Sequence, residues 1–338
     1  MEMLPRSVRA IFIMVALCAM SAPGIAATPL SYLRSHGAHA DPVKTLTWAL
    51  LVLSIVVVLV ITGLVVWGIA RSTADQGDVI SREGNGLRFV TAGLTLTVIA
   101  LLGSVVWTMV VLARVGSPPA EPKLTLDING RQWWWRVRYE SDEPGRVFVT
   151  ANELHIPVGE PVRIKLSSLD VIHSFWVPAL AGKTDTVPGQ VNTTWIEADA
   201  PGVYFGQCAE FCGAQHAHMG LRIVAEPRDK FEAWLREQIA PAAQPNDAVA
   251  AAGQETFARR CAACHAVRGT KAGGILGPDL SHLASRATLA AGTIPNTAGH
   301  LSAWIADPQH FKPGTRMPAV PLTGSELEQV RAYLATLN

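Results

Sequence analysis

The chain has 338 residues, of which 49% are hydrophobic and only 16% are charged. Soluble domains average about 25% charged residues, so this composition excludes a wholly soluble or disordered protein and indicates that part of the chain lies in lipid. Its 28 basic and 27 acidic residues leave a net charge of +1, which provides no overall field to concentrate polyanions and argues against nucleic acid as a partner.

The amino terminus has the pattern of a signal peptide over residues 1–27. Arg6 and Arg9 precede an apolar run at residues 10–20, and a Pro-Gly pair and small residues follow. Cleavage after these small residues removes Cys18. The alternative is an uncleaved first anchor, but the apolar run is shorter than the roughly 20 residues that a membrane span needs.

Two longer runs without a charged residue follow at residues 45–70 and 89–113. At about 1.5 Å per helical residue, each can cross about 30 Å of hydrocarbon. The connection at residues 72–88 is too short and polar for a domain, so the sequence predicts a transmembrane hairpin over residues 28–115. The alternative is two buried helices of a soluble bundle. Two crossings from an exported amino terminus place residues 114–338 outside the cytoplasm.

The pattern then becomes strand-like, which predicts a small antiparallel β domain over residues 116–226. Aliphatic residues alternate with basic ones at positions 162–166, and short β-branched runs are separated by proline and glycine. Such alternation is typical of a strand with one buried and one solvated face.

Two further segments complete the predicted organisation. Residues 227–247 predict a helix followed by a proline-containing linker. Residues 248–338 are alanine-rich and helical in pattern, and the Ser325-x-x-Glu328 sequence predicts a capping box at the start of the last helix.

Soft metal ligands gather within a short stretch of the predicted β domain. Cys208, Cys212, His216 and Met219 lie close together in sequence, and sulfur and imidazole ligands together select copper. If each thiolate bridges two metal ions, each copper needs only one histidine and a weak axial ligand in addition. The second histidine must come from elsewhere, and His173, which follows a predicted strand, is the best candidate.

Other interpretations of this stretch are weaker. A disulfide between Cys208 and Cys212 suits an exported protein but leaves His216 and Met219 without a role. Zinc is disfavoured because a thioether is a poor zinc ligand. His218 lies two residues from His216, and spacing alone does not decide which of the two is the ligand.

Three consecutive tryptophans precede this region. In a strand, Trp133 and Trp135 share one face and Trp134 lies on the other. The three indoles therefore cannot all enter one core, and we expect one to meet solvent, lipid headgroups or a partner.

Cys261-Ala-Ala-Cys264-His265 is the attachment pattern of a c-type haem, with two thioether anchors and the proximal iron ligand. A thioredoxin-like motif is the alternative, but its βαβ context is missing. Met317 is the expected sixth ligand, and His/Met ligation suits an electron carrier. Other downstream histidines are expected at the surface or beside the haem propionates: His282, His300 and His310.

The segment HSFWVP that begins at His173, followed by C-x-E-x-C-x-x-x-H-x-x-M from Cys208, resembles subunit II of cytochrome c oxidase. The similarity covers nearly all of residues 28–225, including the hairpin. It implies a cupredoxin-like barrel with a dinuclear copper centre. The ligands that it implies by position are His173, Cys208, Glu210, Cys212, His216 and Met219.

The same resemblance implies particular roles for single residues. It favours His216 over His218, and it makes Trp133 the residue through which electrons reach the copper. Glu210 gives its backbone carbonyl to copper and directs its carboxylate toward a magnesium ion at the interface with subunit I. Many relatives carry a glutamate for proton entrance at the start of the second span, where this chain offers only Glu83 nearby.

Residues 248–338 resemble class I cytochrome c, since Gly253, Phe257 and the Gly277-Pro278-x-Leu280 segment match that family. The predicted fold is therefore multidomain, with a two-helix transmembrane hairpin, an all-β cupredoxin-like barrel and an all-α cytochrome c domain. The resemblance places the copper and haem domains on the periplasmic side of a bacterial inner membrane.

Together these features predict the subunit through which electrons enter a haem-copper cytochrome c oxidase. An external donor, such as a cytochrome c or the preceding respiratory complex, passes electrons to haem c, to the copper pair and then to subunit I, which reduces oxygen to water. Subunits I and III and membrane lipid are the expected partners, and the chain alone carries electron transfer only. The alternatives are the same role in a copper-containing nitric oxide reductase and a stand-alone membrane-anchored carrier.

Overall fold

The computed structural model describes residues 30–71 and 86–338. The predicted signal peptide with Cys18, and Glu83 in the loop between the predicted spans, lie outside the described residues.

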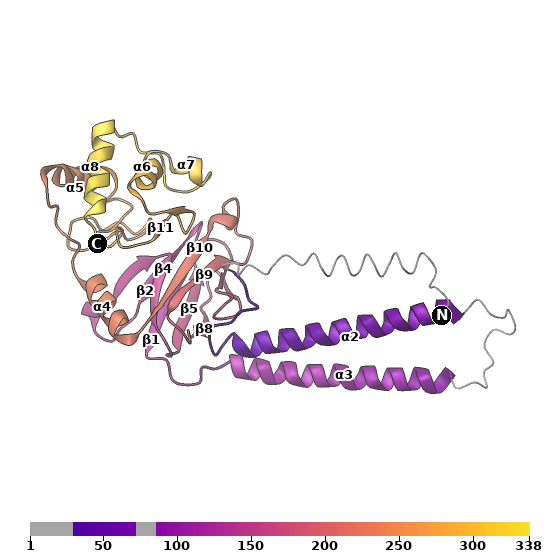
Figure 1. Cartoon of the computed structure of the whole chain (residues 1–338). Helices are drawn as coiled ribbons and strands as arrows, with labels where there is room; N and C mark the ends of the chain where they lie inside the picture. The colour runs from indigo at the N-terminus through magenta and orange to yellow at the C-terminus, as the bar shows by residue number, and fades with distance from the viewer. Residues whose placement is uncertain (1–29, 72–85) are drawn as a thin grey trace.

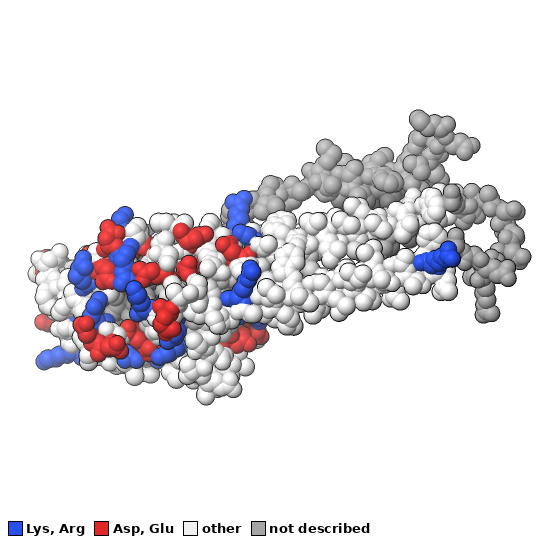
Figure 2. All heavy atoms as spheres, turned by 90° about the horizontal axis from the view of Figure 1, so that it is seen from below, with Lys and Arg blue, Asp and Glu red and all other residues white. Residues whose placement is uncertain are grey.

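Two long helices, α2 (Asp41–Arg71) and α3 (Gly86–Val115), run side by side and project from the rest of the chain (Figure 1). They contain both predicted spans, and each is long and apolar enough to cross a membrane. Their apolar side chains point outward on all sides; Phe89, for example, is 77% exposed. Lys, Arg, Asp and Glu gather over the folded domains and are nearly missing from the hairpin on the face shown in Figure 2. A helix that is apolar all round needs an apolar surrounding, so the hairpin has the surface of a membrane anchor.

Ten strands form two facing five-stranded sheets. The first sheet has the order β3-β2-β1-β5-β8, with β1 (Leu124–Arg131), β2 (Trp134–Tyr139), β3 (Phe148–Ala151), β5 (Val162–Ser168) and β8 (Asn192–Ile196). The second has the order β4-β10-β9-β6-β7, with β4 (Glu153–Pro157), β6 (His173–Trp176), β7 (Thr184–Thr186), β9 (Gly202–Cys208) and β10 (Gly220–Glu226).

The predicted antiparallel arrangement is wrong for two strand pairs. Strand β1 pairs with β5 in parallel, and β4 pairs with β10 in parallel. The reason is that the chain changes sheets at Asn152, between β3 and β4, so strands distant in sequence become neighbours. Asn152 has a φ of 62° and its side chain accepts a hydrogen bond from the Trp135 backbone N–H at 2.8 Å. Asparagine tolerates this left-handed conformation better than most residues.

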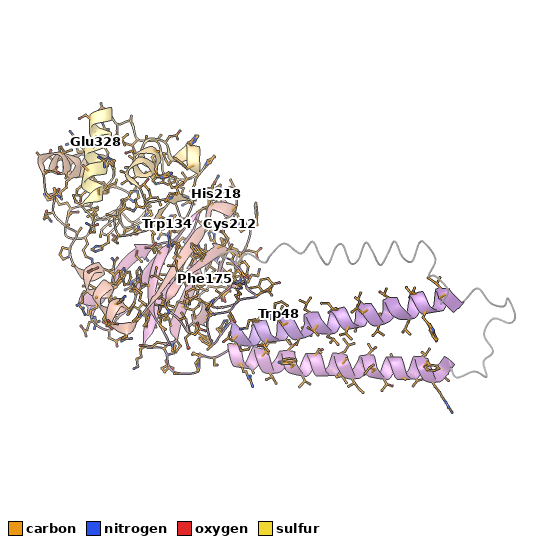
Figure 3. The ribbon with its side chains drawn as sticks, in the orientation of Figure 1. Trp48, Trp134, Phe175, Cys212, His218 and Glu328 are labelled. Atoms are coloured by element: carbon orange, nitrogen blue, oxygen red, sulfur yellow. The ribbon has the colours of Figure 1, made fainter. Side chains whose placement is uncertain are left out.

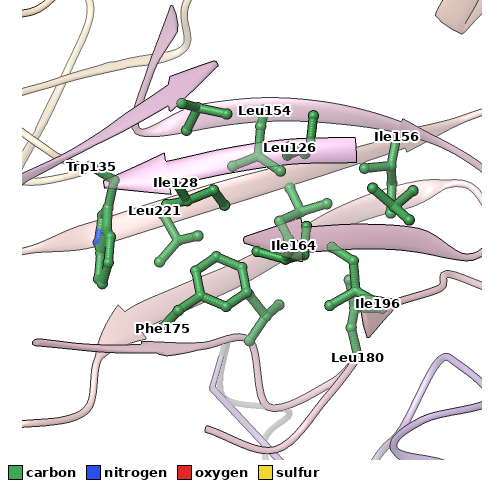
Figure 4. Packing of buried hydrophobic residues seen from close by; sticks show 14 of the residues in the cluster. Leu126, Ile128, Trp135, Leu154, Ile156, Ile164, Phe175, Leu180, Ile196 and Leu221 are labelled. Carbon is green, nitrogen blue, oxygen red and sulfur yellow. The ribbon is translucent and has the colours of Figure 1, made fainter. Parts of the chain in front are cut away.

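The core lies between the two sheets. Val162, Ile164 and Leu166 are completely buried, as their alternation with basic residues predicts. Figure 4 shows Ile164 facing Phe175 and Leu221 of the other sheet. Burial of these side chains holds the sheets together and so fixes the ends of the strands that carry the candidate metal ligands.

Replacing Ile164 with alanine is expected to destabilise the β domain by about 2–5 kcal/mol, because the cavity cannot close fully in a packed core. Denaturant unfolding of the purified protein, followed by tryptophan fluorescence, measures the loss. Val191, which is 67% exposed, supplies the control, since its replacement with alanine should change stability by less than about 0.5 kcal/mol. A loss below about 1 kcal/mol for Ile164→Ala would contradict the packing described above.

Helix α4 (Arg228–Ile239) follows β10, where the sequence predicts a helix, and it packs Phe231 and Leu235 against the β domain. The C-terminal domain then begins with α5 and lies away from the helix hairpin (Figure 1). Its elements are α5 (Ala248–Arg260), β11 (Thr288–Leu289), β12 (Ile294–Pro295), α6 (Ala298–Ala306), α7 (Pro308–Phe311) and α8 (Gly324–Ala335).

The contact between α5 and α8 depends on Gly253. A Cβ atom at this position would lie 1.9 Å from the backbone oxygen of Gln329, so only glycine lets the helices approach this closely. The predicted capping box is wrong by two residues. Thr323 caps α8 and forms the box with Glu326, because the same Ser/Thr-x-x-Glu spacing occurs twice and the extended backbone at Thr323 ends the preceding loop.

Candidate functional site

Strand pairing brings His173 next to Cys208. Strand β6 begins at His173 and runs antiparallel to β9, with Phe175 opposite Cys208. The Ala209 N–H donates to the Ser174 carbonyl at 3.0 Å and continues the ladder into the loop. As a result, His173 Nδ1 lies 3.9 Å from Cys208 Sγ, and both residues are buried.

The loop after β9 folds its remaining sulfur and imidazole groups onto the same point. The Sγ atoms of Cys208 and Cys212 are 3.7 Å apart, and Cys212 Sγ lies 3.6 Å from His216 Nδ1 and 3.9 Å from Met219 Sδ. The backbone oxygen of Glu210 is 3.3 Å from Cys208 Sγ. Both cysteines are free thiols, and their separation is far above the roughly 2.05 Å of a disulfide.

The structure therefore brings together all of the donors that the sequence analysis assigned to copper. His173, Cys208 and Cys212 alone offer three ligand atoms within 4.8 Å of one another. His218, the alternative to His216, points elsewhere: its Nδ1 lies 2.7 Å from Gln215 Oε1. The donor set, rich in sulfur and imidazole, fits copper better than harder ions.

Asp170 orients His173. Its Oδ1 lies 2.9 Å from His173 Nε2, which leaves Nδ1 facing the thiols; metal-binding histidines are commonly held in this way through their other nitrogen. Burial alone would raise the pKa of Asp170, but hydrogen bonds from His173 and from the N–H groups of Gln132 and Val171 lower it to about 2. Burial would lower the pKa of His173, but the bond to Asp170 raises it overall.

The two thiols interact strongly. The hydrogen bond from Cys212 lowers the pKa of Cys208 to about 3, although burial opposes this change. The same hydrogen bond, together with burial, raises the pKa of Cys212. The lowered pKa of Cys208 favours the thiolate form of this sulfur, which is the form that binds metals.

Burial of the tryptophans alternates as predicted, but Trp133 lies in the turn before β2 and not in the strand. Trp133 and Trp135 are buried, whereas Trp134 is partly exposed beneath the Arg131 guanidinium. The Trp133 indole N–H donates to the Cys212 carbonyl at 3.0 Å, so this ring directly contacts the loop of the candidate copper site. Figure 3 shows Trp134, Cys212 and His218 at the end of the β domain that faces the C-terminal domain.

Sequence reasoning missed two residues that shape this site. Asp170 precedes His173 by three residues, and an acidic residue near a metal-binding histidine is the signal that could have found it. Gly130 lies inside β1, and a Cβ there would be 2.7 Å from the His173 ring. A glycine inside a strand often marks such a close approach.

Glu210 lies at the surface, and its carboxylate contacts Lys183 Nζ at 3.1 Å. The neighbouring Phe211 is 78% exposed. The Glu210 carboxylate is thus accessible from outside the chain, although Lys183 pairs with it.

The haem-attachment motif lies in the turn that ends α5. Cys261 is the C-cap of this helix, and both motif cysteines are free and half-buried. His265 Nδ1 lies 2.8 Å from the Pro278 carbonyl, which makes Nδ1 the protonated nitrogen and leaves Nε2 free for iron. Burial lowers the pKa of His265, which favours the neutral ligand form. A Cβ at Gly277 would lie 2.5 Å from the His265 ring, so the residues present fit a haem.

The loop that carries Met317 is fixed to α7. Gln309 Nε2 donates to the backbone oxygens of Thr315 and Met317 at 2.8 and 2.9 Å. The other downstream histidines differ in setting. His310 is exposed and His300 half-buried. His282 is buried, with its Nδ1 2.6 Å from the Asn338 carbonyl, which excludes the surface alternative for this residue, and its position beside the haem propionates stays a prediction.

Comparison with known proteins agrees with this geometry. Residues 141–226 match the family model for the cytochrome c oxidase subunit II periplasmic domain, and residues 250–338 match the model for cytochrome c. The probable cytochrome c oxidase subunit 2 of Rickettsia bellii is 31% identical over 220 residues, which cover 60% of this chain and 81% of the relative. The chain belongs to the cytochrome c oxidase subunit 2 family.

The cytochrome c oxidase subunit 2 of Alkalihalophilus pseudofirmus is 42% identical over 215 residues. This match covers 63% of the present chain and 61% of the length of that relative. Among solved structures, the periplasmic domain of subunit II (CoxB) of Bradyrhizobium japonicum matches with 30% identity and a TM-score of 0.33. It covers 35% of this chain and 95% of that one.

As a subunit 2 family member with a cytochrome c domain, the chain is implied to bind copper and haem. Family membership and the two apolar helices make it a membrane-anchored protein with a periplasmic domain. The predicted fold class, an apolar helix pair, a cupredoxin-like β domain and a helical cytochrome c domain, is confirmed.

Proposed function

We propose that this chain is the subunit through which electrons enter a haem-copper cytochrome c oxidase of the bacterial inner membrane. The observation that carries the proposal is the convergence of two thiols, two imidazoles and a thioether at one end of the β domain, in the same chain as a haem-attachment motif. A copper pair held by these donors would supply one-electron chemistry, and a haem with His/Met ligation would supply a matching carrier.

The ligands follow from this proposal. We assign the copper pair to the donors already described: His173, Cys208, Glu210 through its carbonyl, Cys212, His216 and Met219. We assign the covalent haem to Cys261 and Cys264, with His265 and Met317 as axial ligands. The exposed carboxylate of Glu210 is the proposed ligand for a magnesium ion shared with subunit I.

Trp133 is the proposed route for electrons into the copper site. On one side, its indole donates to the carbonyl of Cys212. On the other, the loop before Met317 lies against its ring, since a Cβ at Gly314 would be 3.7 Å from Trp133 Cη2. One aromatic side chain is therefore hydrogen-bonded to the loop with the copper ligands and lies beside the loop that carries Met317.

Apolar side chains near the candidate copper ligands support a covering partner. Leu169 and Ile172 precede His173, and Phe211 lies between the two cysteines; all three are exposed. Exposed apolar side chains clustered around a site mark an interaction surface. We assign this surface to subunit I, with subunit III and lipid as further neighbours of the hairpin, and we assign the haem domain to an external donor such as a cytochrome c or the preceding respiratory complex.

Isolation of the native complex tests this function. The tagged chain, solubilised in mild detergent, is expected to co-purify with a large haem-copper subunit, and the complex should consume oxygen when haem c is reduced. If the complex reduces nitric oxide and not oxygen, the chain is a subunit of a copper-containing nitric oxide reductase. Purification as a lone subunit with native copper and haem spectra would contradict the proposal and favour a stand-alone carrier.

A further inference from the structure

Lys312 is a buried lysine at the contact between the two periplasmic domains. Its side chain is only 3% exposed. The Nζ atom donates to the backbone oxygens of Trp133 at 2.8 Å, His218 at 2.7 Å and Ala290 at 3.2 Å. An ammonium has three protons, so these carbonyls use its full donor capacity.

In the part of the chain that the structure describes, no carboxylate balances the charge of this lysine. Across residues 30–71 and 86–338, no carboxylate forms an ion pair with Lys312. Burial lowers its pKa to about 7, although the charge of the nearby Cys212 opposes this shift. Burial disfavours the charge of Lys312, and all of its donors are used by carbonyl groups. Its role is therefore hydrogen bonding between segments and not solubility of the surface.

The three acceptors join the two candidate sites. Trp133 and His218 belong to the β domain and flank the copper loop, whereas Ala290 belongs to the haem domain. Lys312 itself begins the loop that reaches Met317. Fixing Lys312 on the Trp133 carbonyl therefore also fixes Gly314 against the Trp133 ring.

Neighbouring hydrogen bonds hold the same interface. The Gly220 N–H donates to the Ala291 carbonyl at 2.9 Å, and Gln215 Nε2 donates to the Pro313 carbonyl at 2.8 Å. Arg131 Nη1 donates to the Ile275 carbonyl at 2.8 Å, but this contact is exposed. Among these groups, only Lys312 is both charged and buried, so its loss leaves the most acceptors without a partner.

We infer that Lys312 is a positioning residue that docks the haem-ligand loop on Trp133 and so sets the rate of electron transfer from haem to copper. This inference rests on the proposed function. It requires no new chemistry, because the lysine acts by hydrogen bonding alone and is neither oxidised nor reduced.

Lys312→Met in the intact complex tests the inference, because methionine keeps an unbranched apolar side chain but cannot donate. The rate of electron transfer from photoreduced haem to copper is expected to fall at least about tenfold, since three buried carbonyls lose their donor. Copper content, haem content and both optical spectra should be unchanged. Lys271, an exposed lysine of the same domain, supplies the matched control, and Lys271→Met should transfer electrons at the normal rate.

A second readout does not depend on electron transfer. Hydrogen exchange of the Gly220 amide, which donates across the interface, should accelerate at least about tenfold in Lys312→Met and stay normal in Lys271→Met. Arg131→Gln removes a weaker contact of the same interface and should slow electron transfer by about threefold.

Three results would overturn the inference. Normal transfer and normal Gly220 exchange in Lys312→Met would show that the lysine does not dock the domains. Loss of haem or of the native haem spectrum would indicate a role in folding of the haem domain alone. Fast Gly220 exchange with a normal transfer rate would separate docking from electron transfer. Absence of haem-to-copper transfer in the unmodified complex would instead refute the proposed function, which distinguishes the two failures.

Discussion

Replacing Cys212 with serine is expected to abolish the copper pair while leaving the haem in place. Cys212 Sγ is the central atom of the site, within 4 Å of Cys208 Sγ, His216 Nδ1 and Met219 Sδ. A serine oxygen is a hard, protonated group that cannot replace a bridging thiolate for copper. The purified variant should contain almost no dinuclear copper centre. Electron transfer out of haem c should therefore stop. Metal analysis and electron paramagnetic resonance measure the first effect, and flash-induced kinetics measure the second.

Two neighbouring histidines provide the matched comparison. His216→Ala should disrupt the copper signal, because its Nδ1 faces Cys212. His218→Ala should preserve it, because the Nδ1 of that residue faces Gln215. Loss of the signal in His218→Ala with retention in His216→Ala would show that the ligand assignment is reversed. A paired-copper signal that survives Cys212→Ser would exclude the bridging role of this thiolate.

Replacing both Cys261 and Cys264 with alanine is expected to eliminate covalent haem from the protein. These cysteines flank the turn that presents His265, whose Nδ1 is bound to the Pro278 carbonyl. Without thioether bonds, acidified organic solvent should remove the haem completely. The C-terminal domain then loses the haem from its interior. The copper site should keep its signal, since its donors come from the β domain alone.

The Met317→Leu variant tests axial ligation of the haem iron separately from covalent attachment of the haem. This variant keeps both cysteines and His265, so the haem should remain covalently bound, but its reduction potential should fall because the thioether ligand is lost. Spectroelectrochemical titration measures the change. Covalent haem in the double cysteine variant, or an unchanged potential in Met317→Leu, would contradict the haem assignment.

The features that the sequence predicts correctly are those whose residues lie close together along the chain. The hairpin follows from two long uncharged runs, and α2 and α3 contain both of them. The gathering of Cys208, Cys212, His216 and Met219 follows from their close spacing on one loop. His173 comes from a separate segment; its place after a predicted strand makes it the best candidate, the family resemblance agrees, and strand pairing places it beside Cys208.

The features that sequence reasoning missed depend on contacts between distant segments. The parallel pairings of β1 with β5 and of β4 with β10 arise because the chain changes sheets at Asn152, and alternation of residue types does not reveal this change. Lys312 resembles any other lysine in sequence, since its three acceptors come from positions far along the chain. Only the docking of one domain on the other brings them together.

The measurement that tests the central claim most directly is the copper-to-haem ratio of the purified chain, combined with electron paramagnetic resonance of its oxidised form. We predict two copper ions per covalent haem and a signal in which one unpaired electron is shared equally by two copper nuclei. Zinc, a single copper, or a disulfide between Cys208 and Cys212 in a fully metallated preparation would contradict the claim and reduce the protein to a membrane-anchored cytochrome c.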